Sequence, residues 1–423
     1  MKGAVFIMKI TLKRITALIT AVIVISCLTV NVFADVTQSA RAVSGNVVTE
    51  YFSSDLTEEI ESVASIPMSS PPEINAKSVI LMEQSTGKVL YEKNSDEALP
   101  PASITKIMTM VLICEALDSG ALKMTDVVTA SEHAASMGGS QIWLEPKETM
   151  NVKDLIKAVA IGSANDASVA LAEHIAGSEE GFVTMMNEKA KQLGMKNTVF
   201  KNACGLDADG HLSTARDVAI MSRELLKHNV IREFTNIWMD SLRGGETQLV
   251  NTNKLVRFYL GATGLKTGTT DKAGSCLSAS AKRDNMELIA VVMGAVDSKE
   301  RFAGAKKLLD YGFANWKITT PTVDKSSLSS LPVTMGQKDE LKLYFDEINP
   351  ELIRNGEKAA IKTVTDLPES VEAPIVKGQQ IGKFKITNGD KVLSEYAVYS
   401  AEDVDRINFG FSFSRLMTKL LAG

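Results

Sequence analysis

The spacing of hydrophobic positions predicts several helices in the first two thirds of the chain. Between Ser103 and Asp118 the apolar residues recur at steps of three and four, which is typical of a helix with one buried face. Related patterns predict three more helices and the capped start of another, at 151–160, 165–176, 179–193 and 213–217. Residues 298–315 then predict a last helix of this region.

Short β-rich segments flank this helical region on both sides. Residues 77–83 and 88–93 are separated by the turn residues Ser85-Thr86-Gly87, and residues 275–282 and 286–293 form a second pair. Both arrangements are typical of hairpins. Since strands from the two ends of a helical insertion can pair in one sheet, we expect an α/β domain built on an antiparallel sheet.

Beyond Pro321 the pattern changes to shorter β-rich segments that Gly and Pro interrupt. Examples are 340–345, 359–364 and 383–386. This pattern predicts a separate all-β domain with the form of a β-sandwich. We therefore expect an α/β domain over residues 76–317 and a β-sandwich over 318–400. Residues 35–75 are rich in Ser, Thr, Val and Glu and have no sustained period, so we expect them to form a flexible leader.

Residues 1–34 have the pattern of a secretory signal peptide. Four basic residues precede an uncharged stretch from Ile15 to Val32, and the segment ends in a small residue, Ala34. An uncleaved membrane anchor is one alternative, because about 18 apolar residues can span a bilayer. Lipoprotein processing at Cys27 is another. Each alternative still predicts an exported protein.

Composition and charge exclude several classes of protein. The chain of 423 residues is 45% hydrophobic and 23% charged, which is ordinary for a globular protein. Its formal net charge is −5 without any basic block, so we do not expect nucleic acid as a partner. Once the signal peptide is removed, Cys114, Cys204 and Cys276 remain, and we expect them to be packing residues. No set of metal ligands and no cofactor motif is visible in the sequence.

Three short motifs stand in order along the predicted α/β domain. They are Ser103-Ile104-Thr105-Lys106, Ser163-Ala164-Asn165 and Lys266-Thr267-Gly268-Thr269. Taken alone, Ser103 would most simply be a helix N-cap. The combination is more specific, because a Ser-x-x-Lys and a Ser-x-Asn at helix starts, followed by a Lys-Thr-Gly leading into a strand, are what penicillin-recognising acyltransferases require.

The spacing of these residues suits covalent catalysis. Ser103 and Lys106 lie one helical turn apart, so a neutral Lys106 amine could take the proton of the Ser103 hydroxyl. Burial of Lys106 and the nearby cation Lys266 would both favour that neutral form. The backbone N–H groups of Ser103 and Thr269 could hold a developing oxyanion. Gly268, which has no side chain, would let substrate lie against the strand.

The motifs resemble those of serine-type D-alanyl-D-alanine carboxypeptidases, which are low-molecular-mass penicillin-binding proteins of bacterial cell walls. Further stretches support the resemblance: Pro100-Pro101-Ala102-Ser103, Asn202-Ala203-Cys204-Gly205-Leu206, Ser213-Thr214-Ala215-Arg216-Asp217, Gly264-Leu265-Lys266-Thr267-Gly268 and Asp271-Lys272-Ala273-Gly274. The resemblance covers nearly everything after residue 75. It implies a penicillin-binding (β-lactamase/transpeptidase-like) catalytic domain and a C-terminal β domain that lifts this domain off the membrane.

The same resemblance implies an activity and a role for each motif residue. The activity is removal of the terminal D-alanine from peptidoglycan pentapeptide stems, with β-lactam antibiotics as inhibitors. Ser103 is expected to be the nucleophile, Lys106 its base, and Ser163 with Asn165 the groups that relay a proton and orient the substrate. The other expected substrate-binding residues are Lys266, Thr267, Gly268, Thr269 and Arg301, with Arg301 near the substrate carboxylate. Thr269 stands where some members carry His, which leaves the role of its side chain open.

Two other functions remain to be weighed. A serine β-lactamase would use the same acylation apparatus but needs a second base, and the second motif here is Ser163-Ala164-Asn165 rather than Ser-Asp-Asn. A non-catalytic peptidoglycan-binding module would lose its nucleophile or base, whereas all three motifs are intact. Both alternatives are therefore less favoured than the carboxypeptidase.

The final segment, residues 401–423, predicts an amphipathic membrane-anchor helix. One helical face is wholly apolar and carries Phe413, Leu416, Met417, Leu420 and Leu421, while cations are supplied by Arg406, Arg415 and Lys419. The segment is too short and too charged to span a bilayer, but it suits the interface of an anionic membrane. A helix docked on the β domain is the alternative. We expect the protein at the outer face of the cytoplasmic membrane.

Overall fold

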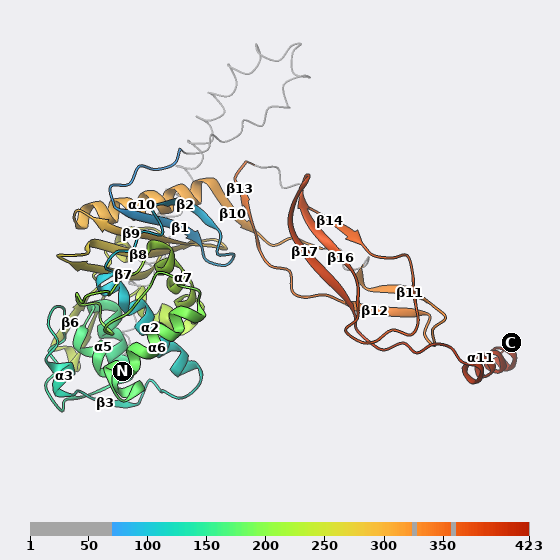
Figure 1. Ribbon diagram of the computed structural model, residues 1–423, viewed down its shortest axis with the longest axis horizontal. Coiled ribbons are helices and arrows are strands. Elements are labelled where there is room, and N and C mark those ends of the chain that lie inside the picture. Colours follow the sequence, from blue (N-terminus) through green and yellow to red (C-terminus); the bar gives the residue numbers. More distant parts are fainter. Residues whose placement is uncertain (1–69, 324–327, 357–360, 423) are drawn as a thin grey trace, which may run out of the picture. The chain divides into compact units, whose positions relative to one another are not determined.

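The computed structural model describes residues 70–323, 328–356 and 361–422 (Figure 1). The signal peptide predicted at residues 1–34 lies outside the described residues, as does most of the leader predicted at 35–75.

A five-stranded antiparallel sheet is the framework of the first domain. Its strand order is β2-β1-β9-β8-β7. The strands are β1 (Ser78–Glu83), β2 (Val89–Lys93), β7 (Ala262–Thr270), β8 (Gly274–Arg283) and β9 (Met286–Ala295). Strands from both ends of the helical insertion therefore share one sheet, which confirms the predicted α/β fold.

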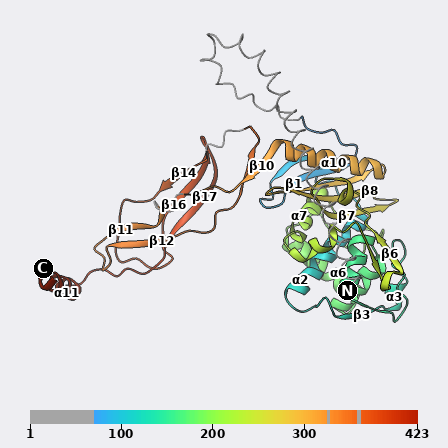
Figure 2. The ribbon, with the colours of Figure 1, turned by 180° about the vertical axis from the view of Figure 1, so that it is seen from behind.

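The sheet is buried on both faces, and the alternation of residues along β1 shows how. Val79 and Leu81 pack in one apolar cluster with the helix α10 (Ser298–Asn315), whereas Ile80 and Met82 belong to a larger cluster with the remaining helices. Successive residues of a strand point to opposite faces. Figures 1 and 2 show the result, with α10 on one side of the sheet and helices including α2 and α7 on the other.

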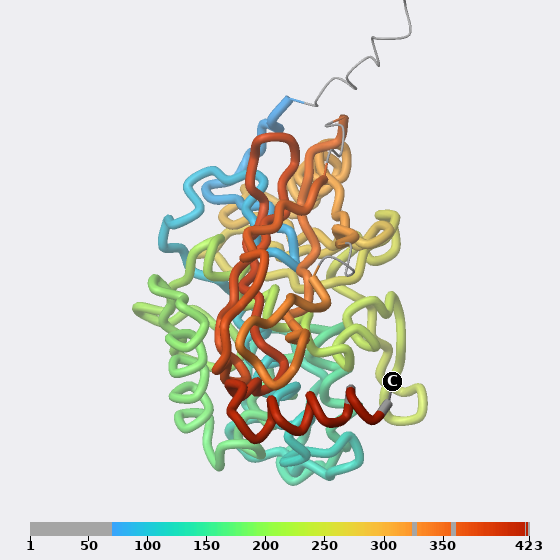
Figure 3. Tube along the Cα trace, turned by 90° about the vertical axis from the view of Figure 1, so that its right-hand side faces the viewer, coloured from blue at the N-terminus to red at the C-terminus, as the bar shows by residue number. Residues whose placement is uncertain are grey.

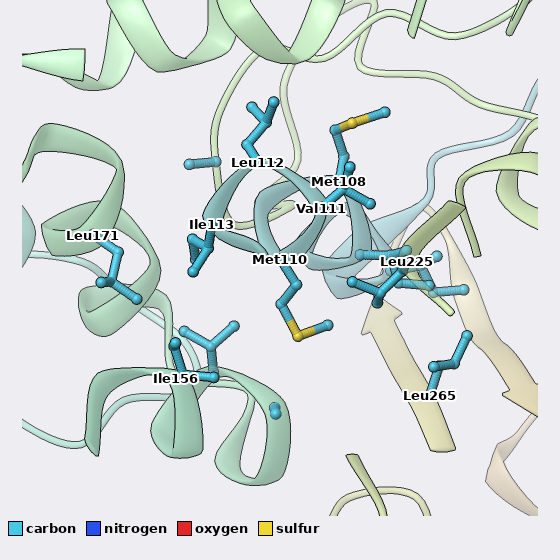
Figure 4. Packing of buried hydrophobic residues seen from close by; sticks show 14 of the residues in the cluster. Met108, Met110, Val111, Leu112, Ile113, Ile156, Leu171, Leu225 and Leu265 are labelled. Atoms are coloured by element: carbon cyan, nitrogen blue, oxygen red, sulfur yellow. The ribbon is translucent and has the colours of Figure 1, made fainter. Parts of the chain in front are cut away.

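The helix α2 (Lys106–Asp118) lies at the centre of the larger cluster. Every residue from Lys106 to Cys114 is buried, so the helix has no exposed face over its first two turns. Figure 4 shows its side chains surrounded by Ile156, Leu171, Leu225 and Leu265. The sequence predicted only one buried face. The difference arises because helices and the sheet enclose α2 on all sides, as expected for a helix that is apolar all round.

The remaining elements of this domain are further helices, turns and two small two-stranded sheets. The α-helices are α3 (Glu132–Ala135), α4 (Val152–Lys157), α5 (Asn165–Ala176), α6 (Glu179–Gln192), α7 (Ala215–Leu225), α8 (Arg232–Thr235) and α9 (Leu255–Phe258). The turns are η1 (Ala102–Thr105), η2 (Ala158–Gly162), η3 (Asn229–Ile231) and η4 (Arg243–Gly245). The two-stranded sheets pair β3 (Val127–Thr129) with β4 (Thr149–Asn151) and β5 (Met239–Leu242) with β6 (Thr247–Val250).

Three local predictions need correction, and each concerns a motif. Ser103 does not cap an α-helix, because it lies inside the 3₁₀ turn η1 that precedes α2. The helix predicted over 151–160 ends at Lys157 and continues as the π-helical turn η2, a form that is common at functional sites. Lys266 and its neighbours do not lead into a strand but lie within β7 itself.

The C-terminal domain is all-β, as the sequence predicted. Six strands form a sheet in the order β14-β16-β17-β12-β11-β15, and β10 pairs with β13. Their bounds are β10 (Trp316–Thr319), β11 (Ser330–Thr334), β12 (Glu340–Tyr344), β13 (Glu351–Arg354), β14 (Ile361–Asp366), β15 (Val371–Glu372), β16 (Gln380–Asn388) and β17 (Lys391–Ser400). Two small apolar clusters lie in this domain, one around Phe384 and one around Leu341.

The chain ends in the helix α11 (Phe409–Ala422), the dark red helix of Figure 3. Its apolar side chains are exposed rather than packed on the β domain. The exposed fractions lie between 40% and 83% for Phe413, Leu416, Met417, Leu420 and Leu421. Among the described residues, none of the helices has the length and apolar character needed to cross a bilayer.

Candidate active site

The first motif brings a hydroxyl and a buried amine together. Ser103 lies in η1, and the preceding residue, Ala102, has a φ of 48°, a conformation that is rare outside glycine. Lys106 begins α2 and is completely buried. Its Nζ lies 3.0 Å from the Ser103 Oγ. The one-turn spacing in the sequence therefore produces the predicted contact between the two groups.

Lys106 also reaches two acceptors from other parts of the chain. Its Nζ donates to the Asn165 Oδ1 at 2.5 Å and to the backbone carbonyl of Cys204 at 2.6 Å. These bonds satisfy a polar group that would be costly to bury alone. They also tie the first motif to the second, because Asn165 is the last residue of Ser163-Ala164-Asn165 and the first of α5.

The burial of Lys106 lowers its pKa to about 8. Loss of hydration disfavours the charged form, while Cys204 and Asp166 oppose the shift. The sequence had suggested that the cation Lys266 would contribute to this shift. Lys266 in turn has a pKa well below its ordinary value, because of burial first and then because of the nearby Lys106 and Arg301.

The second motif sits on strained backbone. Ser163 ends η2 with φ 63° and ψ 28°, in the left-handed region that non-glycine residues rarely adopt. It is only 4% exposed. The Asn165 Nδ2 donates to the carbonyl of Gly138 at 2.6 Å, so the Asn165 side chain bridges Lys106 and the loop that contains Gly138. Strain of this kind persists where the surroundings fix the backbone, and it is frequent at active sites.

The third motif lies on β7, which is an outer strand of the sheet. Lys266 is completely buried and donates to the carbonyl of Thr267 at 2.9 Å. The Thr267 hydroxyl donates to the Thr252 Oγ1 at 2.7 Å. Thr252 was not singled out from the sequence, because no local pattern indicates that its loop contacts β7.

Gly268 also makes a close backbone contact that the sequence did not indicate. A Cβ at this position would lie 2.9 Å from the Ser103 backbone nitrogen and 3.0 Å from both the Ala102 Cβ and the Pro101 carbonyl oxygen. The missing side chain therefore lets β7 pack directly against the turn that carries Ser103. Gly205, in a different loop, also needs to lack a side chain. A Cβ there would lie 2.0 Å from the Ala102 carbonyl oxygen, so the missing side chain lets this loop approach the same turn.

Arg301 reaches the same strand from α10. Its Nη1 donates to the Gly268 carbonyl at 3.0 Å, to the Thr269 Oγ1 at 2.8 Å and to the Cys276 carbonyl at 3.3 Å. Burial lowers the pKa of Arg301. Arg301 thus supports the backbone around Lys-Thr-Gly and adds a cation beside it. The Thr269 side chain serves as one of its acceptors.

The three cysteines among the described residues, Cys114, Cys204 and Cys276, are buried and form no disulfide, as expected of packing residues. Near the site, Cys204 acts through its backbone carbonyl, which accepts from Lys106. The Asn202 side chain accepts from the Gly205 N–H at 2.6 Å and shapes this turn. The Asn202–Leu206 stretch was part of the resemblance found in the sequence. The sequence alone did not show that this stretch supplies an acceptor for Lys106.

One group of side chains in the described residues could approach a metal ion. It consists of Glu115, Glu224 and His228. Lys189 already pairs with both carboxylates. The group lies at the opposite end of α2 from Ser103, so we treat it as an ion-pair network and assign it no metal.

The assembled groups have the chemistry of acyl transfer. A hydroxyl faces an amine whose pKa allows a neutral form near pH 8, and such a pair can act as nucleophile and base. Two further buried basic side chains, Lys266 and Arg301, lie at the adjacent strand. They favour an anionic ligand there.

Comparison with known proteins agrees with this chemistry. Residues 65–297 match the family model of D-alanyl-D-alanine carboxypeptidase peptidases, and residues 316–406 match the model of the penicillin-binding protein 5 C-terminal domain. The D-alanyl-D-alanine carboxypeptidase DacF of Bacillus subtilis is 49% identical over 346 residues, which cover 81% of this chain and 89% of the relative.

Solved structures of penicillin-binding proteins are also similar to this chain. Penicillin-binding protein 5 from Haemophilus influenzae matches with a TM-score of 0.72 and 34% identity, over 80% of this chain and 100% of that one. Penicillin-binding protein D2 from Listeria monocytogenes, solved in a cefotaxime-bound form, matches with a TM-score of 0.54 and 33% identity. The second match covers 58% of this chain and 100% of the other.

The close approach of β7 to the Ser103 turn can be tested with Gly268→Ala. The added Cβ would overlap backbone atoms, so we expect a loss of stability of about 1–3 kcal/mol and a slower reaction of Ser103. Thermal melts and the rate of labelling by a fluorescent penicillin measure both effects. The control is Gly410→Ala, where the nearest atom to the new Cβ is 3.5 Å away. Wild-type labelling by the Gly268 variant would contradict this account.

Proposed function

Because this chain belongs to the D-alanyl-D-alanine carboxypeptidase family, we propose that it removes the terminal D-alanine of peptidoglycan pentapeptide stems through an acyl-enzyme on Ser103. The observation that carries this assignment is the contact of 3.0 Å between the Ser103 Oγ and the Nζ of the buried Lys106. The comparisons do not favour a β-lactamase or a non-catalytic peptidoglycan-binding module.

In the first step Lys106, in its neutral form, accepts the proton of the Ser103 hydroxyl. The Oγ then attacks the carbonyl carbon of the penultimate D-alanine. The backbone N–H groups of Ser103 and Thr269 stabilise the oxyanion of the tetrahedral intermediate. Collapse of this intermediate breaks the peptide bond, and the proton held by Lys106 passes to the leaving amine, with Ser163 as the relay.

Water then hydrolyses the ester on Ser103 and regenerates the free hydroxyl. Asn165 orients the substrate and fixes Lys106, since its side chain bonds both the Lys106 Nζ and the Gly138 carbonyl. Penicillins meet the same nucleophile, because their lactam carbonyl offers the same type of acyl carbon. The cefotaxime-bound form of the Listeria protein supports β-lactam binding by this chain.

Lys266 recognises the C-terminal carboxylate of the substrate, and Arg301 assists through Thr269. In the free protein, burial and the neighbouring cations keep the pKa of Lys266 well below its ordinary value. A bound carboxylate would favour the charged form again. Recognition by Lys266 therefore depends on the negative charge of the ligand.

We also propose that the protein is exported and stays at the outer face of the cytoplasmic membrane. The exposed apolar face of α11 supports this location. The cations that the sequence offered for an anionic membrane are partly used elsewhere, because Arg406 pairs with Glu372 and Arg415 with Asp339. Attachment by the apolar side chains therefore matters more than attachment by charge.

The pH dependence of acylation tests the role of Lys106. Its neutral fraction grows with pH until the pKa of about 8 is passed, so the rate should rise about tenfold per pH unit at lower pH and level off above it. Stopped-flow acylation by a chromogenic cephalosporin between pH 5.5 and 9.5 measures the profile. Ser103→Ala should not react at all, and Lys106→Ala should react very slowly without this rise. A flat wild-type profile would remove Lys106 as the base.

Recognition of the substrate carboxylate is tested with Lys266→Gln. We expect acylation by a peptide with a free terminal carboxylate to fall about 10–100-fold more than acylation by the matching methyl ester, the range for a hydrogen bond to a charged group. Lys272→Gln is the control, because Lys272 is an exposed lysine just beyond the same strand. Equal losses on both substrates would assign Lys266 to the positioning of the strand instead.

Membrane attachment is tested by deleting α11 from Phe409 onward, which keeps the contacts of Arg406. We expect the processed protein to move to the soluble fraction while its turnover of a small peptide is nearly unchanged. A full-length variant with Phe413, Leu416 and Leu420 replaced by Ser should behave in the same way, because it loses the apolar face and keeps the cations. Continued sedimentation of both variants with membranes would refute the anchor.

A further inference from the structure

The loop of residues 138–146 begins at the active site and is fastened to the start of α5. The Asn165 Nδ2 donates to the Gly138 carbonyl at 2.6 Å, and the Asn165 backbone N–H donates to the Ser140 carbonyl at 2.7 Å. Since Asn165 also bonds Lys106, the first residues of this loop lie beside the reacting groups. The rest of the loop leads away from these residues.

Two side chains of opposite charge hold the middle of the loop. The buried carboxylate of Asp166 accepts from the backbone N–H of Ile142 at 3.1 Å and from that of Leu144 at 3.0 Å. From the other side, the Arg243 Nη1 donates to the Ile142 carbonyl at 2.8 Å. Arg243 is itself fixed, because its Nε donates to the Glu148 carboxylate at 2.7 Å. The backbone around residue 143 is thus fixed from both sides.

The loop that Asp166 and Arg243 hold in place exposes one aromatic side chain to solvent. Ile142 and Leu144 are buried, whereas Trp143 between them is 73% exposed. Trp143 also has a φ of 60°, which is unfavourable for a bulky residue and is found where the surroundings impose it. A glycine would suit this backbone better, so the indole is not there for the stability of the loop.

Trp143 lines an open groove with a volume of about 410 Å³. The lining residues are Glu132, Ala135, Ser136, Gln141, Trp143, Leu144, Glu145 and Pro146. None of them is basic, and Glu132 and Glu145 form no ion pair with any of the described residues. An indole beside two available carboxylates suits an aliphatic chain that ends in an ammonium group, because the ring attracts cations and the chain packs on its face.

We propose that this groove binds an amine-bearing side chain of the stem peptide, on the N-terminal side of the D-alanyl-D-alanine end. The proposal rests on the proposed function, since it concerns the same substrate. The groove is lined by the loop that starts beside Asn165 and by α3, and its charge is opposite to that of an ammonium group. Trp143 and the two glutamates would then determine which stem peptides are preferred, and Arg243 is a positioning residue for Trp143.

A matched pair of peptides tests the proposal on the full-length protein. One is Nα-acetyl-L-lysyl-D-alanyl-D-alanine with a free side-chain amine, and the other carries an acetyl group on that amine. We expect wild-type kcat/KM to be about two- to fivefold higher for the free amine, the range of a cation–π contact at an exposed site. The difference should lie mainly in KM.

Variants of the groove residues test whether the groove causes the preference for the free amine. Trp143→Ala, and a double variant with Glu132→Gln and Glu145→Gln, should lose the preference and keep the wild-type rate on the acetylated peptide. Arg243→Gln should lose it too, with no further loss when it is combined with Trp143→Ala. The control is Phe258→Ala, because Phe258 is an aromatic residue of similar exposure, 70%, and this variant should keep the preference.

Several results would overturn the proposal. One is an equal wild-type kcat/KM for the two peptides. Another is a preference for the free amine that survives in Trp143→Ala, and a third is a loss of kcat/KM in Trp143→Ala that is equal for both peptides. A loss seen only when a disaccharide is attached to the peptide would assign Trp143 to glycan binding instead. If the wild-type protein released no D-alanine from either peptide, the proposed function would fail. Indole fluorescence of Ser103→Ala, titrated with the two peptides and compared with Ser103→Ala/Trp143→Ala, would still test the groove.

Discussion

The burial of Lys106 is the constraint on which the site depends. An amine at the start of α2 is removed from water, and the lowering of its pKa from 10.5 to about 8 corresponds to about 3 kcal/mol. Since the unfolded chain binds the proton more tightly, this cost to the folded state is fully present below pH 8. It disappears as the pH rises toward 10.5. The protein therefore gives up stability at neutral pH to keep an amine that readily becomes neutral.

The surroundings of Lys106 follow from that burial. A buried amine needs acceptors, and they come from distant parts of the chain, the Cys204 carbonyl and the Asn165 side chain. The turn carrying Ser103 must also lie close to both neighbouring segments, which is why Gly205 and Gly268 face it from two directions. The contact between Ser103 and Lys106 is therefore a product of the packing around α2.

Features that depend on local chemistry could be predicted from the sequence, while those that depend on distant contacts could not. The β-rich segments on both sides of the helical region predicted the sheet, and the spacing of Ser103 and Lys106 predicted their contact. The complete burial of α2, the π-helical turn before Ser163 and the placement of Lys266 inside β7 all escaped prediction. Each of these depends on neighbours that lie far away in the sequence. The roles of Gly268 and Thr252 were missed for the same reason.

The distribution of charge around the site gives the substrate a direction. Lys266 and Arg301 are buried at β7, and the Asp166 carboxylate is occupied by backbone N–H groups of the loop at 138–146. Beside Trp143, in contrast, the groove has two glutamates and no basic residue. Under the proposed assignments, a peptide with an anionic end and a cationic branch meets complementary charge in one orientation and like charge in the other. Because like charges disfavour the reversed orientation, binding itself selects the bond that reaches Ser103.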